Sequence, residues 1–90
     1  MKILIIESDE ALRLGCLEIF NIKGIEADAA ATVEEAYSLL ESGAAYSVII
    51  YTNADLCINN YHAVFLEKPY TAHKLLQTAR KGGSTLNGYS

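Results

Sequence analysis

Basic residues are scarce in this 90-residue sequence, which has seven Lys and Arg against eleven Asp and Glu and a formal net charge of −4. Nucleic-acid binding needs Lys and Arg gathered on one surface, but only Arg80 and Lys81 are adjacent here. The tyrosines do not alternate with basic residues, so a platform for stacking bases is unsupported as well. We therefore expect no nucleic-acid partner.

Cysteines and long apolar runs are also few. Cys16 and Cys57 lie far apart without metal-ligand spacing, whereas small secreted domains usually carry several disulfides. No apolar run approaches the roughly 20 residues that span a bilayer. The apolar run at the N-terminus is short and ends at acidic residues, unlike a signal peptide. We expect a cytoplasmic protein with reduced thiols, no metal site and no membrane contact.

What the sequence does contain is an alternation of apolar runs and amphipathic segments. Short continuous apolar runs predict strands buried on both faces, and the order of elements predicts an α/β fold with a parallel sheet. The predicted elements are strand 2–6, a helix opened by residues 7–10 and ending before Gly24, strand 25–30, helix 32–42, strand 46–51, strand 63–67, and a helix from Thr71 that Gly82 and Gly83 close. Residues 1–83 form one domain in this prediction, and residues 84–90 form a flexible tail.

Two helices carry more specific signals. Thr32 followed by Glu35 is the pattern of a capping box, in which each side chain accepts a backbone hydrogen bond. In the first helix, Leu14 and Leu17 lie opposite the predicted core stripe, and they are either a binding face or ordinary exposed leucines. The predicted core stripe consists of Leu12, Cys16, Ile19 and Phe20.

Polar residues follow three of the predicted strands. They are Glu7, Ser8, Asp9, Thr52 and Lys68. In an open α/β sheet, ligands bind at the carboxyl ends of the strands. Any site should therefore draw on these five residues.

Three segments resemble the receiver domain of bacterial response regulators. KILIIESDEALR is similar to its first strand with the acidic cluster, YSVIIYT to the strand that ends in the phosphorylated aspartate, and AVFLEKPY to the strand with the Lys-Pro pair. The resemblance covers residues 2–81, and the segment from Phe65 to Tyr70 is its most specific part. It implies a flavodoxin-like parallel sheet, and a cis peptide bond between Lys68 and Pro69.

The departures from the receiver pattern concern its chemistry. An active receiver holds Mg²⁺ with two adjacent acidic residues after the first strand, but these positions are Glu7 and Ser8 here. The aspartate that accepts the phosphoryl group corresponds to Thr52, whose hydroxyl would need an activating base. Mg²⁺ needs carboxylate and phosphate oxygens, so little remains to bind it. We expect no enzymatic activity, no catalytic residue, no metal and no cofactor.

Other residues near these positions have alternative roles. Asp9 could supply a carboxylate one residue late, but an exposed residue that favours the helix dipole is the simpler interpretation. Asp55 could act as an unconventional phosphoacceptor if its loop brought it back to the site. Lys68 corresponds to the lysine that contacts the phosphoryl group in the family, and without that group we expect it to form a salt bridge with Glu7.

The sequence is also too short for a complete receiver. Residues 53–62 allow one minimal parallel crossover, because such a crossover needs at least about 10–12 residues. The resemblance therefore implies a truncated fold of about four strands and about three helices, which lacks the third helix, fourth strand and fourth helix of the family. The family's switch aromatic corresponds to Phe65, which we expect in the core.

This deletion predicts a sheet face without enough helices to cover it. Soluble monomers rarely expose so large an apolar surface. We therefore expect a homodimer that covers this face. It forms either by packing of the bare faces or by exchange of the last strand and helix, with residues 53–62 as the hinge. Alternatively, the linker folds over the gap. The predicted interaction surface consists of Leu14, Leu17, Val48, Ile50, Leu56, Ile58 and Tyr61.

The leading functional hypothesis is thus a non-catalytic pseudo-receiver, which dimerises or binds a signalling protein without a phosphorylation switch. The second hypothesis is a response regulator that accepts a phosphoryl group at Asp55 or another unconventional site. A third is an anion site built from Lys68 and the backbone amides after Ser8.

Overall fold

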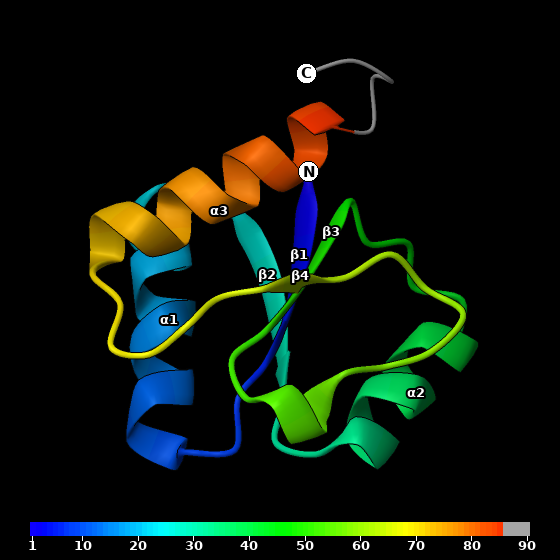
Figure 1. The fold of residues 1–90 in the computed structure, drawn as a ribbon. Helices are drawn as coiled ribbons and strands as arrows, with labels where there is room; N and C mark the ends of the chain where they lie inside the picture. The colour runs from blue at the N-terminus through cyan, green and yellow to red at the C-terminus, as the bar shows by residue number, and fades with distance from the viewer. Residues whose placement is uncertain (86–90) are drawn as a thin grey trace.

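The fold is a four-stranded parallel sheet with α-helices on both faces (Figure 1). The computed structural model describes the backbone of residues 1–85 and the side chains of residues 1–82. Its elements are β1 (Lys2–Ile6), α1 (Glu10–Ile22), β2 (Glu26–Ala30), α2 (Val33–Glu41), β3 (Val48–Tyr51), the 3-10 turn η1 (Ala54–Leu56), β4 (Val64–Phe65) and α3 (Ala72–Thr85). The order of strands is β2-β1-β3-β4. The predicted truncated α/β fold is confirmed.

The β3–β4 connection contains η1 and no other helix or strand, as the predicted deletion requires. β4 pairs directly with β3, in the register Ile50 with Val64 and Tyr51 with Phe65. Only two residues of the predicted strand 63–67 form this ladder. The last strand is therefore short and lies at an edge of the sheet.

The first two helices begin and end as their sequences predict. Asp9 caps α1, where its Oδ1 accepts a hydrogen bond from the Leu12 amide at 3.0 Å. Gly24 has a φ of +71°, the left-handed conformation that glycine adopts after a helix end. Thr32 Oγ1 accepts from the Glu35 amide at 3.1 Å. The Glu35 carboxylate reaches the Ala31 amide at 2.8 Å and not the Thr32 amide of a standard capping box.

The last helix differs from its prediction, because α3 continues through Gly82 and Gly83 to Thr85. Gly82 is buried against β3, and a Cβ atom built there would lie 2.8 Å from Val48 Cγ1. Close packing on the sheet thus outweighs the low helix propensity of glycine. Of the predicted flexible tail, residues 84 and 85 belong to α3, and residues 86–90 lie outside the described part of the chain.

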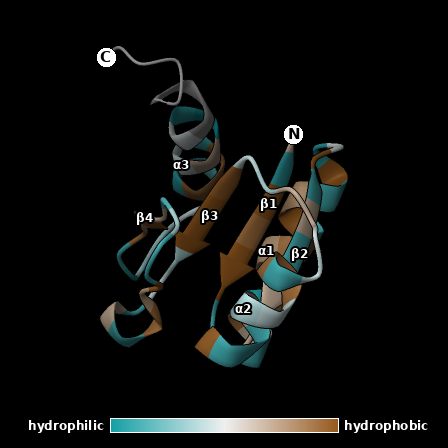
Figure 2. Cartoon of the chain, turned by 90° about the vertical axis from the view of Figure 1, so that its right-hand side faces the viewer, coloured by the Kyte–Doolittle hydropathy of each residue, from teal (hydrophilic) through white to brown (hydrophobic). Residues whose placement is uncertain are grey.

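Each face of the sheet has its own core. Figure 1 places α1 and α3 on one side and α2 on the other, and the central strands β1 and β3 are mostly hydrophobic in Figure 2. The core beneath α1 and α3 contains Ile3, Ile5, Cys16, Phe20, Val48, Ile50, Leu66, Leu75, Leu76 and Ala79. The core on the α2 side contains Leu4, Ile6, Ala30, Ala36, Ile49, Leu56 and Ile58.

The linker between β3 and β4 covers the sheet where helices are missing. Leu56 and Ile58 are only 6% and 4% exposed and belong to the core on the α2 side. The Asn59 amide donates to Tyr37 Oη at 2.8 Å, which ties the linker to α2. The prediction of a bare sheet face is therefore wrong, and the alternative in which the linker folds over the gap is correct.

The predicted interaction surface changes accordingly. Val48 and Ile50 are buried beneath α1 and α3, and Leu56 and Ile58 are buried in the core on the α2 side. These four side chains are therefore too buried to form an interaction surface. Among the remaining members, Leu14 and Tyr61 are exposed and Leu17 is half-buried.

Two predicted core residues lie at the surface instead. Leu12 is 40% exposed, at the N-terminal end of α1, and Phe65 is 46% exposed on the edge strand β4. Phe65 is exposed because no further strand or helix covers the outer side of β4 in the described part of the chain.

No helix within residues 1–85 combines the length and the apolar character that crossing a membrane requires. Both cysteines are free, Cys16 in the core and Cys57 at the surface.

Replacing Leu56 by alanine tests the role of the linker. We expect Leu56→Ala to lower the free energy of unfolding by about 2–4 kcal/mol, because it opens a cavity above the central strands. The matched substitution Leu14→Ala, at a side chain that is 56% exposed, should change it by less than about 0.5 kcal/mol. Chemical denaturation of both variants measures the difference. Equal, small effects would mean that the linker does not cover the sheet.

Candidate functional site

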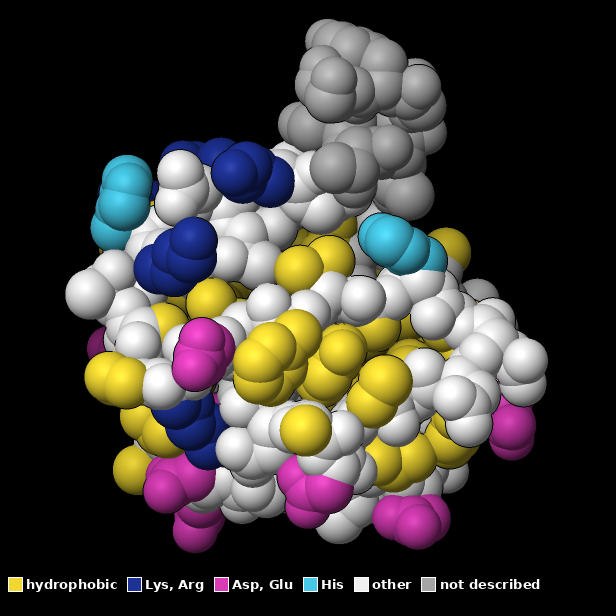
Figure 3. Space-filling view, in the orientation of Figure 1, with side chains coloured by type: hydrophobic (Ala, Val, Ile, Leu, Met, Phe, Trp, Pro, Cys, Tyr) yellow, Lys and Arg dark blue, Asp and Glu magenta, His cyan; other side chains and the backbone are white. Residues whose placement is uncertain are grey.

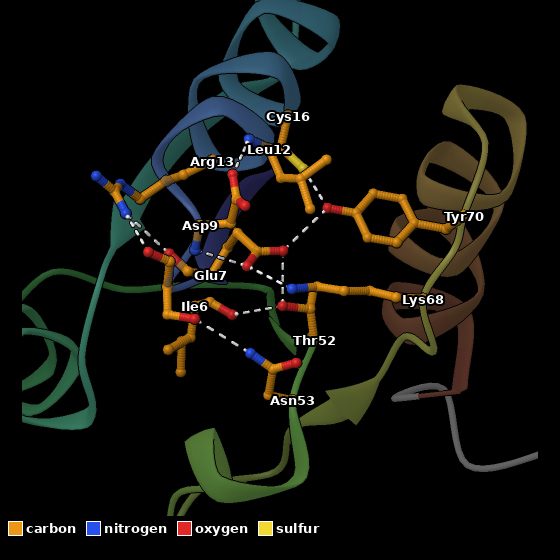
Figure 4. A network of polar contacts seen from close by, with 11 residues as sticks. Ile6, Glu7, Asp9, Leu12, Arg13, Cys16, Thr52, Asn53, Lys68 and Tyr70 are labelled. Carbon is orange, nitrogen blue, oxygen red and sulfur yellow. Dashed lines mark hydrogen bonds and ion pairs between the residues drawn. The ribbon is translucent and has the colours of Figure 1, made fainter.

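Polar side chains from the ends of three strands meet at one edge of the sheet (Figure 4). Glu7 follows β1, Thr52 follows β3, and Lys68 lies three residues beyond β4. The peptide bond between Lys68 and Pro69 is cis, as the resemblance implied. Parallel strands bring their carboxyl ends to the same edge, so these residues meet as the sequence predicts.

The centre of this site is the carboxylate of Glu7, which is fully buried. Its Oε2 accepts hydrogen bonds from Lys68 Nζ at 2.9 Å and from the Asp9 amide at 2.9 Å. Its Oε1 accepts from Thr52 Oγ1 at 2.8 Å and from Tyr70 Oη at 3.3 Å. A carboxylate offers about four acceptor positions, so protein donors occupy the full capacity of Glu7.

These contacts keep Glu7 ionised. Burial by itself raises the pKa of a carboxyl group, but hydrogen bonds from Lys68, the Asp9 amide and Thr52, together with the charge of Lys68, outweigh it. The pKa of Glu7 therefore lies below its usual value. The ion pair of Glu7 with Lys68 that the sequence predicts is confirmed.

A second chain of contacts extends from the carboxylate into the core. Tyr70 Oη lies 3.2 Å from Cys16 Sγ as well as 3.3 Å from Glu7 Oε1. Burial raises the pKa of Tyr70 and of Cys16, and their mutual contact and the charge of Glu7 raise that of Tyr70 further. Both groups are thus protonated at neutral pH. Tyr70 Oη donates to Glu7 Oε1, and either atom can be the donor in its contact with Cys16 Sγ.

The residues at this edge do not fit the Mg²⁺ ion of an active receiver. Mg²⁺ needs carboxylate oxygens with free acceptor positions, whereas the Glu7 oxygens already accept from four protein donors. Ser8 contributes a hydroxyl that accepts from Asn53 Nδ2 at 3.1 Å. Asp9 uses its carboxylate to cap α1 and so does not replace the missing acid. Within the described residues, no group of three or more acidic, His and Cys side chains could hold a metal ion.

The hydroxyl of Thr52 is equally unsuited to accept a phosphoryl group. Thr52 is 2% exposed, so a phosphodonor cannot reach it without opening of the site. Its proton is directed at Glu7, which would have to act as the activating base. The lowered pKa makes Glu7 a weak base for that role. Thr52 is therefore a structural donor in this arrangement.

Asp55 is placed apart from the network. It is an exposed residue of the η1 turn, and its side chain forms no hydrogen bond or ion pair with the described residues. The loop does not bring its carboxylate back to Glu7 or Lys68 in this structure.

Sequence reasoning missed two members of the site. Tyr70 ends the AVFLEKPY segment, and its position beside the Lys-Pro pair is the available signal. Arg13 donates from Nη1 to the backbone oxygens of Glu7 at 3.0 Å and Ser8 at 3.4 Å. Both contacts of Arg13 depend on the bend of the chain between β1 and α1, which no residue spacing reveals.

No protein-family model matches this sequence, and no curated protein is similar to it at a significant level. Solved structures are similar in fold. The receiver domain of the hybrid histidine kinase CckA has a TM-score of 0.77 at 20% identity, with 92% of this chain and 99% of that chain covered. A response regulator receiver domain protein from Clostridium thermocellum has a TM-score of 0.75 at 15% identity, covering 96% of each chain. The chemotaxis response regulator CheY4 of Vibrio cholerae has a TM-score of 0.73 at 16% identity, with 90% and 97% covered. The chain thus has the receiver fold, as its sequence motifs predict.

Replacing Lys68 tests the electrostatic role of the network. We expect Lys68→Met to lower the free energy of unfolding at neutral pH by about 3 kcal/mol, because it leaves the buried Glu7 carboxylate without its cation. The double variant Glu7→Gln/Lys68→Met should recover part of that loss, since no buried charge remains. Denaturant titrations of the two single variants and the double variant measure the coupling. The exposed Lys74 offers the control Lys74→Met; a loss as large there would show that the ion pair is not the cause.

The lowered pKa of Glu7 predicts how stability depends on pH. Folding favours the ionised form of Glu7. Its contribution to the free energy of unfolding is therefore complete above the usual pKa of 4.5 and is lost as the pH falls through the lower pKa of the folded state. Glu7→Gln should reduce stability at neutral pH and flatten the acid limb of the stability–pH curve. Thermal or urea unfolding across the acid range measures both effects. Glu67→Gln, at an exposed carboxylate, should retain the wild-type slope; an unchanged slope in Glu7→Gln would contradict the assignment.

Proposed function

We propose that this chain is a cytoplasmic, non-catalytic pseudo-receiver, which acts in signal transduction by binding other proteins and without a phosphorylation switch. The similar solved structures are named as receiver domains of response regulators and histidine kinases, which supports a signalling role. The observation that carries the proposal is the Glu7 carboxylate, whose acceptor positions are all occupied by protein donors where an active receiver needs a metal ligand.

The alternative hypothesis, a phosphoacceptor at Asp55, has one supporting observation. Asp55 is exposed, so a phosphodonor could reach it. However, it has no contact with Lys68, and within the described residues it belongs to no group of three or more acidic, His or Cys side chains that could hold a metal ion. A phosphoryl group there would have nothing to stabilise it, so we favour the non-catalytic role.

An anion site at the same edge is also less favoured. Lys68 Nζ already donates to Glu7, and the amide of Asp9 donates to the same carboxylate. The amide of Leu12 donates to Asp9. Three of the donors that an incoming anion would use are therefore taken by acidic side chains of the chain itself.

Binding to a different protein is better supported than the homodimer. The predicted homodimer would cover a bare sheet, but Leu56 and Ile58 already cover that face. Exchange of β4 and α3 would also pull this packed linker away from its core. Apart from Tyr61 in the linker, the large exposed apolar side chains of the described residues lie elsewhere, among them Leu12 and Leu14 on α1 and Phe65 on β4.

A titration with beryllofluoride and Mg²⁺ tests the proposal. We expect no saturable change in the amide spectra or thermal midpoint of the wild-type chain, whereas an active receiver run in parallel should respond.

Ser8→Asp/Thr52→Asp places carboxylates at the two positions that lost them. Without Mg²⁺ this variant should be less stable than wild type, because the second substitution buries a new negative charge beside Glu7; Mg²⁺ should restore part of its stability.

The wild-type result decides the outcome. A saturable, Mg²⁺-dependent change that Asp55→Asn abolishes would replace this proposal with the phosphoacceptor hypothesis. A Mg²⁺-dependent change that persists in Asp55→Asn would mean that the Glu7 network opens to bind metal.

A further inference from the structure

The sheet has an open edge at β4. This strand pairs with β3 on one side only, and the order of strands puts no neighbour on its other side within the described residues. A strand edge presents backbone N–H and C=O groups that can pair with another extended chain. In this molecule the edge is only two residues long, which discourages unspecific pairing and leaves specificity to the surrounding side chains.

A groove of about 560 Å³ runs along this edge between β4 and α3. Val64 and Phe65 supply its apolar part, and Phe65 is 46% exposed with its ring 5.3 Å from that of Tyr51. Figure 3 shows apolar side chains gathered over the centre of this face, with Lys and Arg side chains above them over α3. The volume lies within the range of sites that bind ligands and peptide side chains.

The wall of the groove is cationic. Lys74 and Lys81 line it, together with the polar Thr78. α3 holds three of the chain's seven basic residues and no acidic residue, in a chain whose net charge is −4. Glu67, exposed just beyond β4, is the acidic side chain closest to the strand in sequence. The local charge is thus opposite to that of the whole molecule, which favours an acidic occupant.

A second copy of the chain fits this groove less well. Symmetric pairing of two β4 strands would place the cationic α3 helices of both copies on the same side of the joined sheet, where they repel. Head-to-tail pairing would use the acidic edge strand β2. There, Glu26 and Asp28 already lie 3.9 Å and 3.4 Å from Lys2 Nζ. The acidic edge is therefore partly neutralised within its own chain.

We propose that the groove between β4 and α3 binds an extended acidic segment of a partner protein, which adds a strand to β4, packs apolar side chains on Phe65 and pairs carboxylates with Lys74 and Lys81. This names the partner chemistry for the pseudo-receiver role proposed above and rests on it. Strand addition supplies affinity through backbone hydrogen bonds, while alternate side chains supply specificity.

A short peptide of alternating valine and glutamate is the probe. Titrated into isotope-labelled full-length protein, it should shift amide signals of residues 62–66 and 74–82, with a dissociation constant of about 10–100 µM. Lys74→Glu/Lys81→Glu should weaken binding at least about tenfold. Phe65→Ser should weaken it as well. Lys23→Glu, which makes half the charge change of the double variant at an exposed site just beyond α1, should leave the affinity unchanged.

Two control peptides separate strand addition from simple charge attraction. Replacing glutamate by lysine in the probe should abolish binding, and methylating alternate backbone amides should also abolish it. No shifts at this edge, or equal binding of either control peptide, would overturn the proposal. A mass in sedimentation that doubles with concentration and returns to monomer in Phe65→Ser would assign the groove to a second copy instead.

The outcome of the peptide titration can be distinguished from that of the beryllofluoride titration. Failure of the peptide with no response to beryllofluoride would leave the pseudo-receiver role standing and remove this binding site. A genuine response to beryllofluoride would remove the pseudo-receiver role whether or not the peptide binds.

Discussion

A single buried carboxylate organises the carboxyl edge of this sheet. Glu7 is fully buried, and an unpaired charge in that position would be strongly destabilising. Its donors come from the residue that caps α1, from the end of β3 and from the segment between β4 and α3. The carboxylate therefore joins parts of the chain up to 63 residues apart. An active receiver keeps its acidic groups accessible for a metal ion, whereas here the same edge is closed by internal hydrogen bonds.

The short β3–β4 linker has two structural consequences. Its Leu56 and Ile58 cover the central strands, so the chain buries both sides of its sheet without a second copy. The same deletion places the edge strand β4 directly next to β3, where Phe65 is exposed. The faces of the sheet are thus covered, and Phe65 on the edge strand remains exposed. The edge strand β4 and the cationic helix α3 together line a groove.

Much of the candidate site could be predicted from the sequence because the parallel sheet determines where strand ends meet. Glu7, Thr52 and Lys68 each follow an apolar run, and the ion pair between Glu7 and Lys68 follows from their adjacency at that edge. For Asp9 the sequence predicted only an exposed residue at the start of the helix, and the structure shows that it caps α1 through the Leu12 amide. Tyr70, Cys16 and Arg13 could not be placed in the same way, since their contacts depend on side-chain directions that spacing along the chain does not determine.

The sequence by itself determined the order of strands and helices along the chain and the parallel α/β class, because these depend on local periodicity. Its resemblance to receivers implied the missing elements and the changed acidic positions, which depend on chain length and residue identity. Only the tertiary structure decided which side chains are buried. Leu56 and Ile58 lie in the core, Phe65 and Leu12 lie at the surface, and α3 continues through Gly82. Each of these outcomes depends on packing between distant segments, which local sequence patterns do not record.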